Sequence, residues 1–98
     1  MTPEGKVKKA IKAYLDSIHC YYFMPVQTGF GRATVDILVC HKGQFYGIEV
    51  KKPDPKNPIP KVTARQDEIM FLIRQAGGIA FATSSVEHVK AMIGPDVV

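Results

Sequence analysis

The sequence has few of the features that mark secreted, membrane-bound and metal-thiolate proteins. Its 98 residues include only two cysteines, Cys20 and Cys40, and their spacing suits neither a zinc site nor a disulfide framework. No apolar run approaches the roughly 20 residues that span a bilayer, and the N-terminus lacks the apolar stretch of a signal peptide. We therefore expect a cytoplasmic protein with no membrane partner, whose two thiols are reduced and buried.

The length and net charge of the chain limit its domain organisation and the kind of partner it can bind. A chain of 98 residues has room for one hydrophobic core, so we expect a single domain over residues 1–98, with 94–98 as a short tail. There are no internal repeats and no low-complexity segment. The net charge of +4 and the isoelectric point of about 9.2 favour an anionic partner, with nucleic acid first among the candidates.

Two strand-like runs, 34–41 and 44–51, are separated only by the dipeptide Lys42-Gly43. A two-residue connection of this kind predicts a β-hairpin. Closing the hairpin at that turn determines which residues of the two strands face each other. A β-bulge would shift the pairing by one residue, so the register depends on a regular turn.

Three ionisable residues, Asp36, Glu49 and Lys51, interrupt these runs, where a buried face should be apolar. Counting back from the turn places Asp36 opposite Glu49, and period-two alternation puts Glu49 and Lys51 on one face. Two carboxylates about 5 Å apart repel by about 3 kcal/mol at an effective dielectric constant of about 20. A divalent cation such as Mg²⁺ would offset that repulsion, because it takes carboxylate oxygens as ligands. The alternative is that both carboxylates face solvent on a half-exposed sheet.

The N-terminal segment predicts an amphipathic helix that begins at Thr2 and Pro3. Its apolar stripe runs from Val7 to Ile18 at helical spacing. Glu4 lies three residues before Val7 and so belongs to the stripe. Its carboxylate either stabilises the helix dipole in the first turn or points toward a metal. The lysines of this helix are expected to lie largely away from the stripe, namely Lys6, Lys8, Lys9 and Lys12.

The segments on either side of the hairpin are expected to be an edge strand and loops. Residues 20–27 are aromatic-rich but contain a proline, which predicts an edge strand or bulge. The glycine-punctuated segment 28–33 is either a plain turn or a substrate-contacting loop that carries Arg32. It is not a phosphate-binding P-loop, because the Gly-Lys-Ser/Thr ending and the following helix are missing. Residues 52–61 contain four prolines and three lysines, which predicts a basic surface loop.

A second helix begins at a capping box in which Gln66 reaches back to Thr63, and it extends through Leu72 until Gly77-Gly78 ends it. Gln66 also leans toward the sheet, so its side chain either caps the helix only or contributes to a site. A short strand follows at 79–83. The last helix, capped by Ser84 or Ser85, is expected to turn five side chains inward: Val86, Val89, Ala91, Met92 and Ile93.

The order of elements is helix, three strands, helix, strand, helix. The first three strands can form an antiparallel meander, and a helical crossover makes the fourth strand parallel to the third. We therefore expect an α/β fold of order αβββαβα, with a mixed four-stranded sheet flanked by helices.

This element order, together with its charged residues, resembles the PD-(D/E)xK nuclease superfamily and, more narrowly, a stand-alone virus-type replication–repair nuclease (VRR-NUC) domain. The resemblance runs from about residue 2 to about residue 93 and implies a restriction-endonuclease-like core. Val35 stands where the superfamily motif has proline. The residues that carry the resemblance are Glu4, Asp36, Glu49-Val50-Lys51 and Thr63-Ala64-Arg65-Gln66.

The resemblance implies a role for each of these positions. Mg²⁺, with Mn²⁺ as a substitute, would be bound by Glu4, Asp36, Glu49 and the Val50 carbonyl. Lys51 would orient or activate the attacking water, and Gln66 would complete the catalytic group of Asp36, Glu49 and Lys51. The candidates for binding the DNA backbone are Arg32, Lys52, Lys56, Lys61 and Arg65.

The function predicted on this basis is a metal-dependent, structure-selective DNA endonuclease, acting on branched DNA such as four-way junctions. Such an enzyme would serve DNA repair, or work in the host cytoplasm if it is a phage protein. One alternative is a non-catalytic nucleic-acid-binding module with the same fold, and another is a sequence-specific restriction-like nuclease. A symmetric homodimer is expected, because two cuts in a junction need two sites and two residues of Tyr21–Met24 should point outward.

Overall fold

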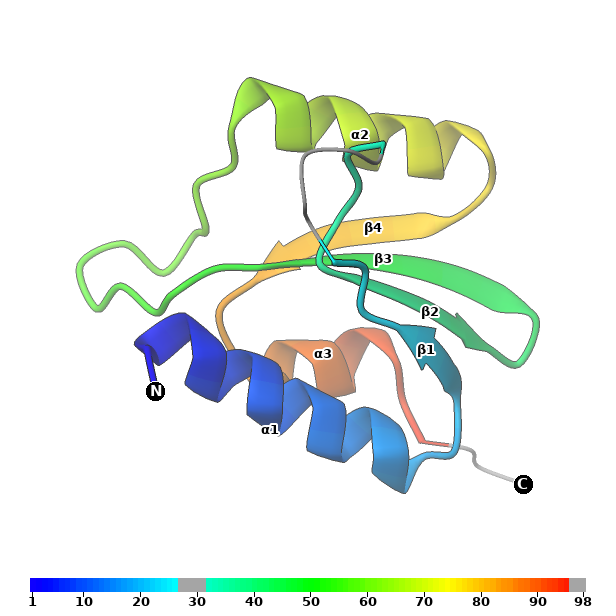
Figure 1. Ribbon diagram of the computed structural model, residues 1–98, viewed down its shortest axis with the longest axis horizontal. Helices are drawn as coiled ribbons and strands as arrows, with labels where there is room; N and C mark the ends of the chain where they lie inside the picture. Colours follow the sequence, from blue (N-terminus) through cyan, green and yellow to red (C-terminus); the bar gives the residue numbers. More distant parts are fainter. Residues whose placement is uncertain (27–31, 96–98) are drawn as a thin grey trace.

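The computed structural model describes residues 1–26 and 32–95 (Figure 1). Within these residues the chain forms three helices and four strands in the predicted order αβββαβα, which confirms the α/β fold class. Most of the glycine-punctuated segment 28–33 and the end of the tail lie outside the described residues. The elements are α1 (Pro3–Ser17), β1 (Tyr21–Phe23), β2 (Ile37–His41), β3 (Gln44–Val50), α2 (Ala64–Gln75), β4 (Ile79–Thr83) and α3 (Val86–Met92).

The four strands form one mixed sheet in the order β1-β2-β3-β4. The first three strands are antiparallel neighbours, and β4 pairs with β3 in parallel. The crossover from β3 to β4 passes through α2, which lies on one face of the sheet, while α1 and α3 cover the other face (Figure 1). This is the sheet that the sequence predicts. In the described residues, no helix has the length and apolar character needed to cross a bilayer.

The hairpin between β2 and β3 closes at Lys42-Gly43 as predicted. Both turn residues have positive φ, +53° and +79°, which is the backbone geometry of a type I′ turn. His41 pairs with Gln44 and Ile37 pairs with Ile48, so there is no bulge along the ladder. The regular turn therefore determines the register all the way to the far end of the hairpin.

The main core lies between the sheet and the helix pair α1 and α3. Val7, Ile11 and Leu15 are the buried residues of α1, at the spacing of its predicted stripe. They pack with the inward side chains of β2 and β3 and with Val89 and Ile93 from the α3 end. Ala91 and Met92 were expected to face inward but are exposed, because α3 meets α1 and β4 along one side only.

Helix caps and glycine stops appear where the sequence predicts them. The side chain of Thr2 caps α1, and Thr63 and Gln66 form the reciprocal capping box of α2. Ser85, rather than Ser84, caps α3. Gly77, with φ of +96°, ends α2, because this left-handed conformation is costly for other residues.

The second core is small because α2 covers only part of its face of the sheet. It joins Val35 and Met70 to Ala80, and α2 contacts β3 and β4. Among the described residues, no helix covers the outer part of this face, over β1 and the Cys40 end of β2, although Leu38 of β2 packs against the second core. Leu72 is exposed on the uncovered side, and so is Cys40 of β2, so the expectation of two buried thiols is wrong for Cys40.

Candidate metal and nuclease site

The candidate site lies at the end of the sheet where β2 begins and β3 ends. Asp36 immediately precedes β2, and its Oδ2 accepts a hydrogen bond of 2.8 Å from the backbone N–H of Val50. The prediction that Asp36 lies inside the strand is wrong. The backbone N–H of Val50 bonds to the Asp36 side chain and not to a backbone carbonyl, so the strand begins one residue later, at Ile37. Carrying the pairing of Ile37 with Ile48 one residue further still places Asp36 level with Glu49.

Glu49 is buried beside Asp36, with 6% of its surface exposed. Burial raises the pKa of the Glu49 carboxyl to about 8, and the hydrogen bond and negative charge of Asp36 contribute to the rise. Lys51 and Lys8 lower the pKa by a smaller amount. Because a lone charge in such a place is unfavourable, the buried carboxyl holds a proton at neutral pH unless a cation compensates it. The two acidic side chains of the sequence prediction therefore lie close together, and the proton on Glu49 relieves the repulsion between them.

Gln66 joins Glu49 to Lys51. Its Nε2 donates a hydrogen bond of 3.1 Å to Glu49 Oε1, and its Oε1 accepts one of 2.7 Å from Lys51 Nζ. The same Oε1 accepts the backbone N–H of Thr63 in the capping box, at 2.9 Å. One side chain therefore caps α2 and also hydrogen-bonds both Glu49 and Lys51 at the end of β3.

Lys8 belongs to the site, although the sequence interpretation placed it largely away from the apolar stripe. Its Nζ lies 3.6 Å from Asp36 Oδ1 and 3.7 Å from Glu4 Oε2. The spacing of four residues from Glu4 could have indicated this, because residues i and i+4 share a helix face. The contact with Asp36 could not be inferred from spacing, since it depends on where α1 crosses the sheet.

Asp36 and Glu49 suit a hard cation. Mg²⁺ is commonly held by one or two carboxylates, with water and substrate phosphates as the remaining ligands. Within residues 1–26 and 32–95, no three Asp, Glu, His or Cys side chains converge into a full metal-binding cluster. Glu4 stands apart from the pair, with the Lys8 ammonium between it and Asp36. The two paired carboxylates fit such an ion, and Glu4 remains a predicted third ligand.

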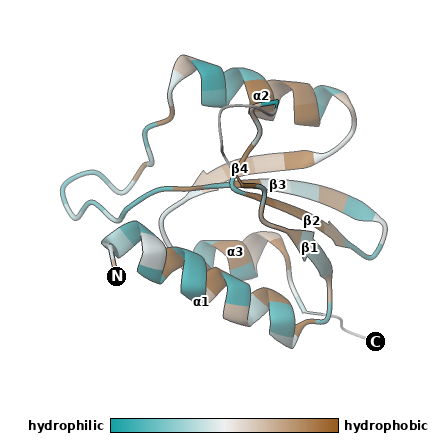
Figure 2. Cartoon of the chain, viewed as in Figure 1, coloured by the Kyte–Doolittle hydropathy of each residue, from teal (hydrophilic) through white to brown (hydrophobic). Residues whose placement is uncertain are grey.

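Two hollows flank the site. The first, of about 280 Å³, is lined by Asp36, Glu49, Gln66 and Arg65, among others. The second, of about 340 Å³, is lined by residues of the loop after β3, together with Glu4 and Lys51. That loop is mostly hydrophilic (Figure 2) and projects beside the start of α1 (Figure 1). The first hollow therefore places polar and charged side chains next to the carboxylate pair, and the second places them next to Lys51.

All five predicted DNA-binding residues are exposed. Arg65 lines the hollow over the carboxylates, and Lys52 and Lys61 line the hollow on the other side of Lys51. Lys56 is exposed on the same loop. Arg32 is exposed in the segment that leads into β2. Three of these basic residues, Arg65, Lys52 and Lys61, therefore line hollows that flank the candidate site.

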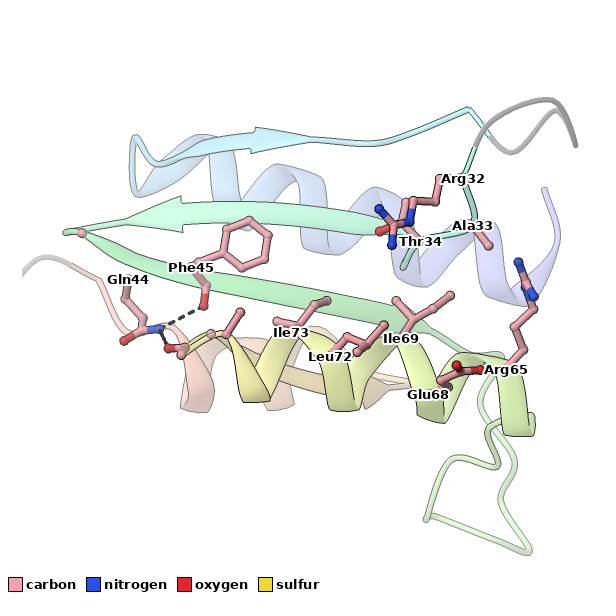
Figure 3. A pocket seen from close by; sticks show the side chains of 14 residues that line it. Arg32, Ala33, Thr34, Gln44, Phe45, Arg65, Glu68, Ile69, Leu72 and Ile73 are labelled. Atoms are coloured by element: carbon pink, nitrogen blue, oxygen red, sulfur yellow. Dashed lines mark hydrogen bonds between the residues drawn. The ribbon is translucent and has the colours of Figure 1, made fainter.

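A groove of about 720 Å³ follows the side of α2 next to the hairpin (Figure 3). Phe45, Ile69 and Leu72 contribute its apolar lining. Arg32, on the segment before β2, and Arg65, at the start of α2, both line the groove toward the end where α2 begins (Figure 3). The groove therefore runs along the uncovered side of α2 and reaches the hollow over the carboxylates, which Arg65 also lines.

Comparison with known proteins identifies the fold. A solved structure described as "VRR_NUC domain" superposes with a TM-score of 0.74 over 94% of this chain and 95% of its own chain, at 24% sequence identity. No protein-family model matches the sequence, and the search of curated proteins gives no match. The chain therefore has the nuclease-like fold of a VRR_NUC domain, with three helices and a mixed four-stranded sheet.

Proposed function

We propose that this chain is a Mg²⁺- or Mn²⁺-dependent DNA endonuclease that hydrolyses phosphodiester bonds. The observation that carries the proposal is the buried Glu49 carboxyl against Asp36, connected through Gln66 to the ammonium of Lys51. The VRR_NUC-like fold supports the same assignment. The combination of two acidic side chains and one basic side chain at a single strand end suits hydrolysis of an anionic ester.

Each side chain has a specific task in this proposal. A metal bound by Asp36, Glu49, Glu4 and the Val50 carbonyl would lower the pKa of a bound water and neutralise charge on the phosphoryl group. Lys51 lies beside the carboxylates and would donate a hydrogen bond to the attacking water or to a phosphoryl oxygen as negative charge develops. Gln66 holds the Lys51 ammonium on the side of Glu49, so that both act at one phosphate.

The basic residues around the site supply binding rather than chemistry. Arg32, Arg65, Lys52, Lys56 and Lys61 would contact phosphates, which position DNA without reading its sequence. Contacts of this kind are better suited to recognising the shape of DNA than its sequence. We therefore propose branched DNA, with four-way junctions first, as the substrate.

The decisive experiment compares DNA structures and metals in one gel assay. Linear duplex, flap, splayed-arm and four-way junction DNAs are incubated with the protein in Mg²⁺, Mn²⁺ or EDTA. We expect cleavage of the junction in either metal and none in EDTA. Binding without cleavage in every metal would instead support a non-catalytic DNA-binding module. Cutting of linear duplex at one fixed sequence would support a restriction-like nuclease.

We further propose that the working form is a homodimer, because symmetric cleavage of a junction needs two sites. Tyr21 and Phe23 of β1 point outward on the uncovered half of the sheet and are 75% and 55% exposed. Cys40 and Phe45, which pair with each other in the next two strands, are exposed as well. An exposed apolar surface of this kind, rich in aromatic side chains, is typical of a protein interface.

Light scattering at micromolar concentration is expected to give about twice the 10.8 kDa chain mass. Phe23→Ser should shift the mass toward the monomer and raise the reactivity of the Cys40 thiol toward a maleimide. Ile59→Ser is the control, because Ile59 is an exposed apolar residue on the loop after β3, away from the β1 surface. A wild-type protein that is monomeric at this concentration, yet makes paired symmetric nicks in a junction, would refute the dimer.

A further inference from the structure

We propose that Lys8 is a built-in counter-ion of the site, whose ammonium group occupies the space of a divalent cation between Glu4 and Asp36 and lowers the metal affinity. This inference rests on the proposed metal site and assigns it a further positioning residue. Lys8 itself neither binds metal nor takes part in the hydrolysis.

The contacts of Lys8 carry the inference. One atom, Nζ, is shared between the two acidic side chains, at 3.7 Å from Glu4 Oε2 and 3.6 Å from Asp36 Oδ1. The Lys8 side chain is 32% exposed and that of Asp36 is 17% exposed, so the pair is partly shielded from solvent. An ammonium group so placed compensates part of the negative charge of the site.

Asp36 is oriented so that one oxygen remains for a cation. Its Oδ2 is held by the backbone N–H of Val50, whereas Oδ1 faces Lys8. The oxygen that a metal ion would take is therefore the one that the ammonium occupies. A divalent ion and the Lys8 ammonium cannot both lie against this oxygen, because they repel each other at such a distance.

Lys8 also explains why Glu4 lies apart from the Asp36 and Glu49 pair. The described residues contain no cluster of three acidic, His or Cys side chains, and Lys8 lies between Glu4 and the carboxylate pair. Lys8 and Glu4 are one helical turn apart on α1, so the ammonium can keep Glu4 beside the site. When a metal displaces the ammonium from Asp36, Glu4 can join Asp36 and Glu49 as a ligand. The flexible stem of lysine allows its charge to move away without movement of the helix.

Metal titration of a matched set of variants tests the proposal. Mn²⁺ affinity is measured by calorimetry for the wild type, Lys8→Met, Lys8→Arg and Lys9→Met. Lys9→Met removes the same charge from an exposed neighbouring position of α1. We expect Lys8→Met to tighten Mn²⁺ binding by about five- to tenfold, Lys9→Met to change it by less than about twofold, and Lys8→Arg to stay near the wild type.

A second readout is independent of metal affinity. In EDTA, Lys8→Met should lower the melting temperature, because it leaves Asp36 and Glu4 without their counter-ion, and saturating Mn²⁺ should remove the difference from the wild type. A merely structural lysine would destabilise the protein equally with and without metal.

The outcomes separate the two proposals. If Mn²⁺ binds and Asp36→Asn abolishes binding, but Lys8→Met and Lys9→Met behave alike, the role of Lys8 is refuted and the metal site stands. If Lys8→Met weakens Mn²⁺ binding, the counter-ion role is also refuted. If the wild type binds no Mn²⁺ that depends on Asp36, the metal site itself fails, and with it the role of Lys8.

Discussion

Asp36→Asn and Glu49→Gln are each expected to lower the rate of DNA cleavage by at least about a thousandfold, because both remove a charged oxygen ligand from the proposed metal site. Their metal affinity should fall as well. Lys51→Ala is expected to lower cleavage by about a hundredfold or more while leaving Mn²⁺ affinity near that of the wild type, since its ammonium acts on the reacting groups. Single-turnover cleavage of a four-way junction and Mn²⁺ calorimetry measure the two properties separately.

Matched controls distinguish these effects from loss of structure. Lys9→Ala removes the same charge as Lys51→Ala from an exposed position of α1 and should leave cleavage unchanged. Thr63→Ala and Gln66→Ala both break the capping box of α2, but only Gln66 contacts Glu49 and Lys51. Gln66→Ala should therefore reduce cleavage well beyond Thr63→Ala. Equal rates for this pair would restrict Gln66 to a capping role.

The affinity for Mn²⁺ is expected to rise about tenfold per pH unit up to pH 8 and to level off above it. The cause is the Glu49 carboxyl, whose pKa is raised to about 8, mainly by burial, so that a metal must displace its proton at lower pH. Calorimetry at pH 6.5 in two buffers of different ionisation enthalpy should report the release of about one proton per metal. Constant affinity between pH 6 and pH 8 would contradict a buried Glu49 ligand.

The stability of the protein in EDTA should show the opposite trend. The pKa of Glu49 is about 8 in the folded chain, against 4.5 as the ordinary value, so the folded state holds the extra proton between these limits. Stability therefore falls as pH rises from about 4.5 to about 8 and stays reduced above that range. Glu49→Gln should be more stable than the wild type by at least about 1 kcal/mol at pH 8.5, and close to it at pH 4.5. Thermal unfolding at the two pH values measures the difference.

Local rules of sequence were sufficient for much of the fold. The two-residue turn at Lys42-Gly43 determined the hairpin register, because a type I′ turn leaves no freedom in the pairing of the flanking strands. Capping residues placed the starts of the helices, and the helical crossover made β4 parallel to β3. Such features depend on residues close together in the chain, so they can be inferred without the structure.

The meeting of Asp36 with Glu49 also followed from sequence, because both residues lie on one hairpin and the turn aligns them. Its consequences did not follow. The pKa of Glu49 depends on burial by surrounding elements, and the alternative of a solvent-facing carboxylate was open until that burial was known. The position of Asp36 just outside β2 likewise depends on a side-chain bond to Val50, which no strand propensity describes.

The sequence by itself therefore determined the order of elements, the register of the hairpin and the acidic and basic residues at its end. Only the tertiary structure decided that Lys8 reaches Asp36, that Cys40 is exposed, and that α2 packs on the β3 and β4 side of the sheet. The physical reason is that a helix can lie at several positions across a sheet with the same apolar stripe buried. The packing of distant segments selects one position, and that choice determines which long side chains reach the site.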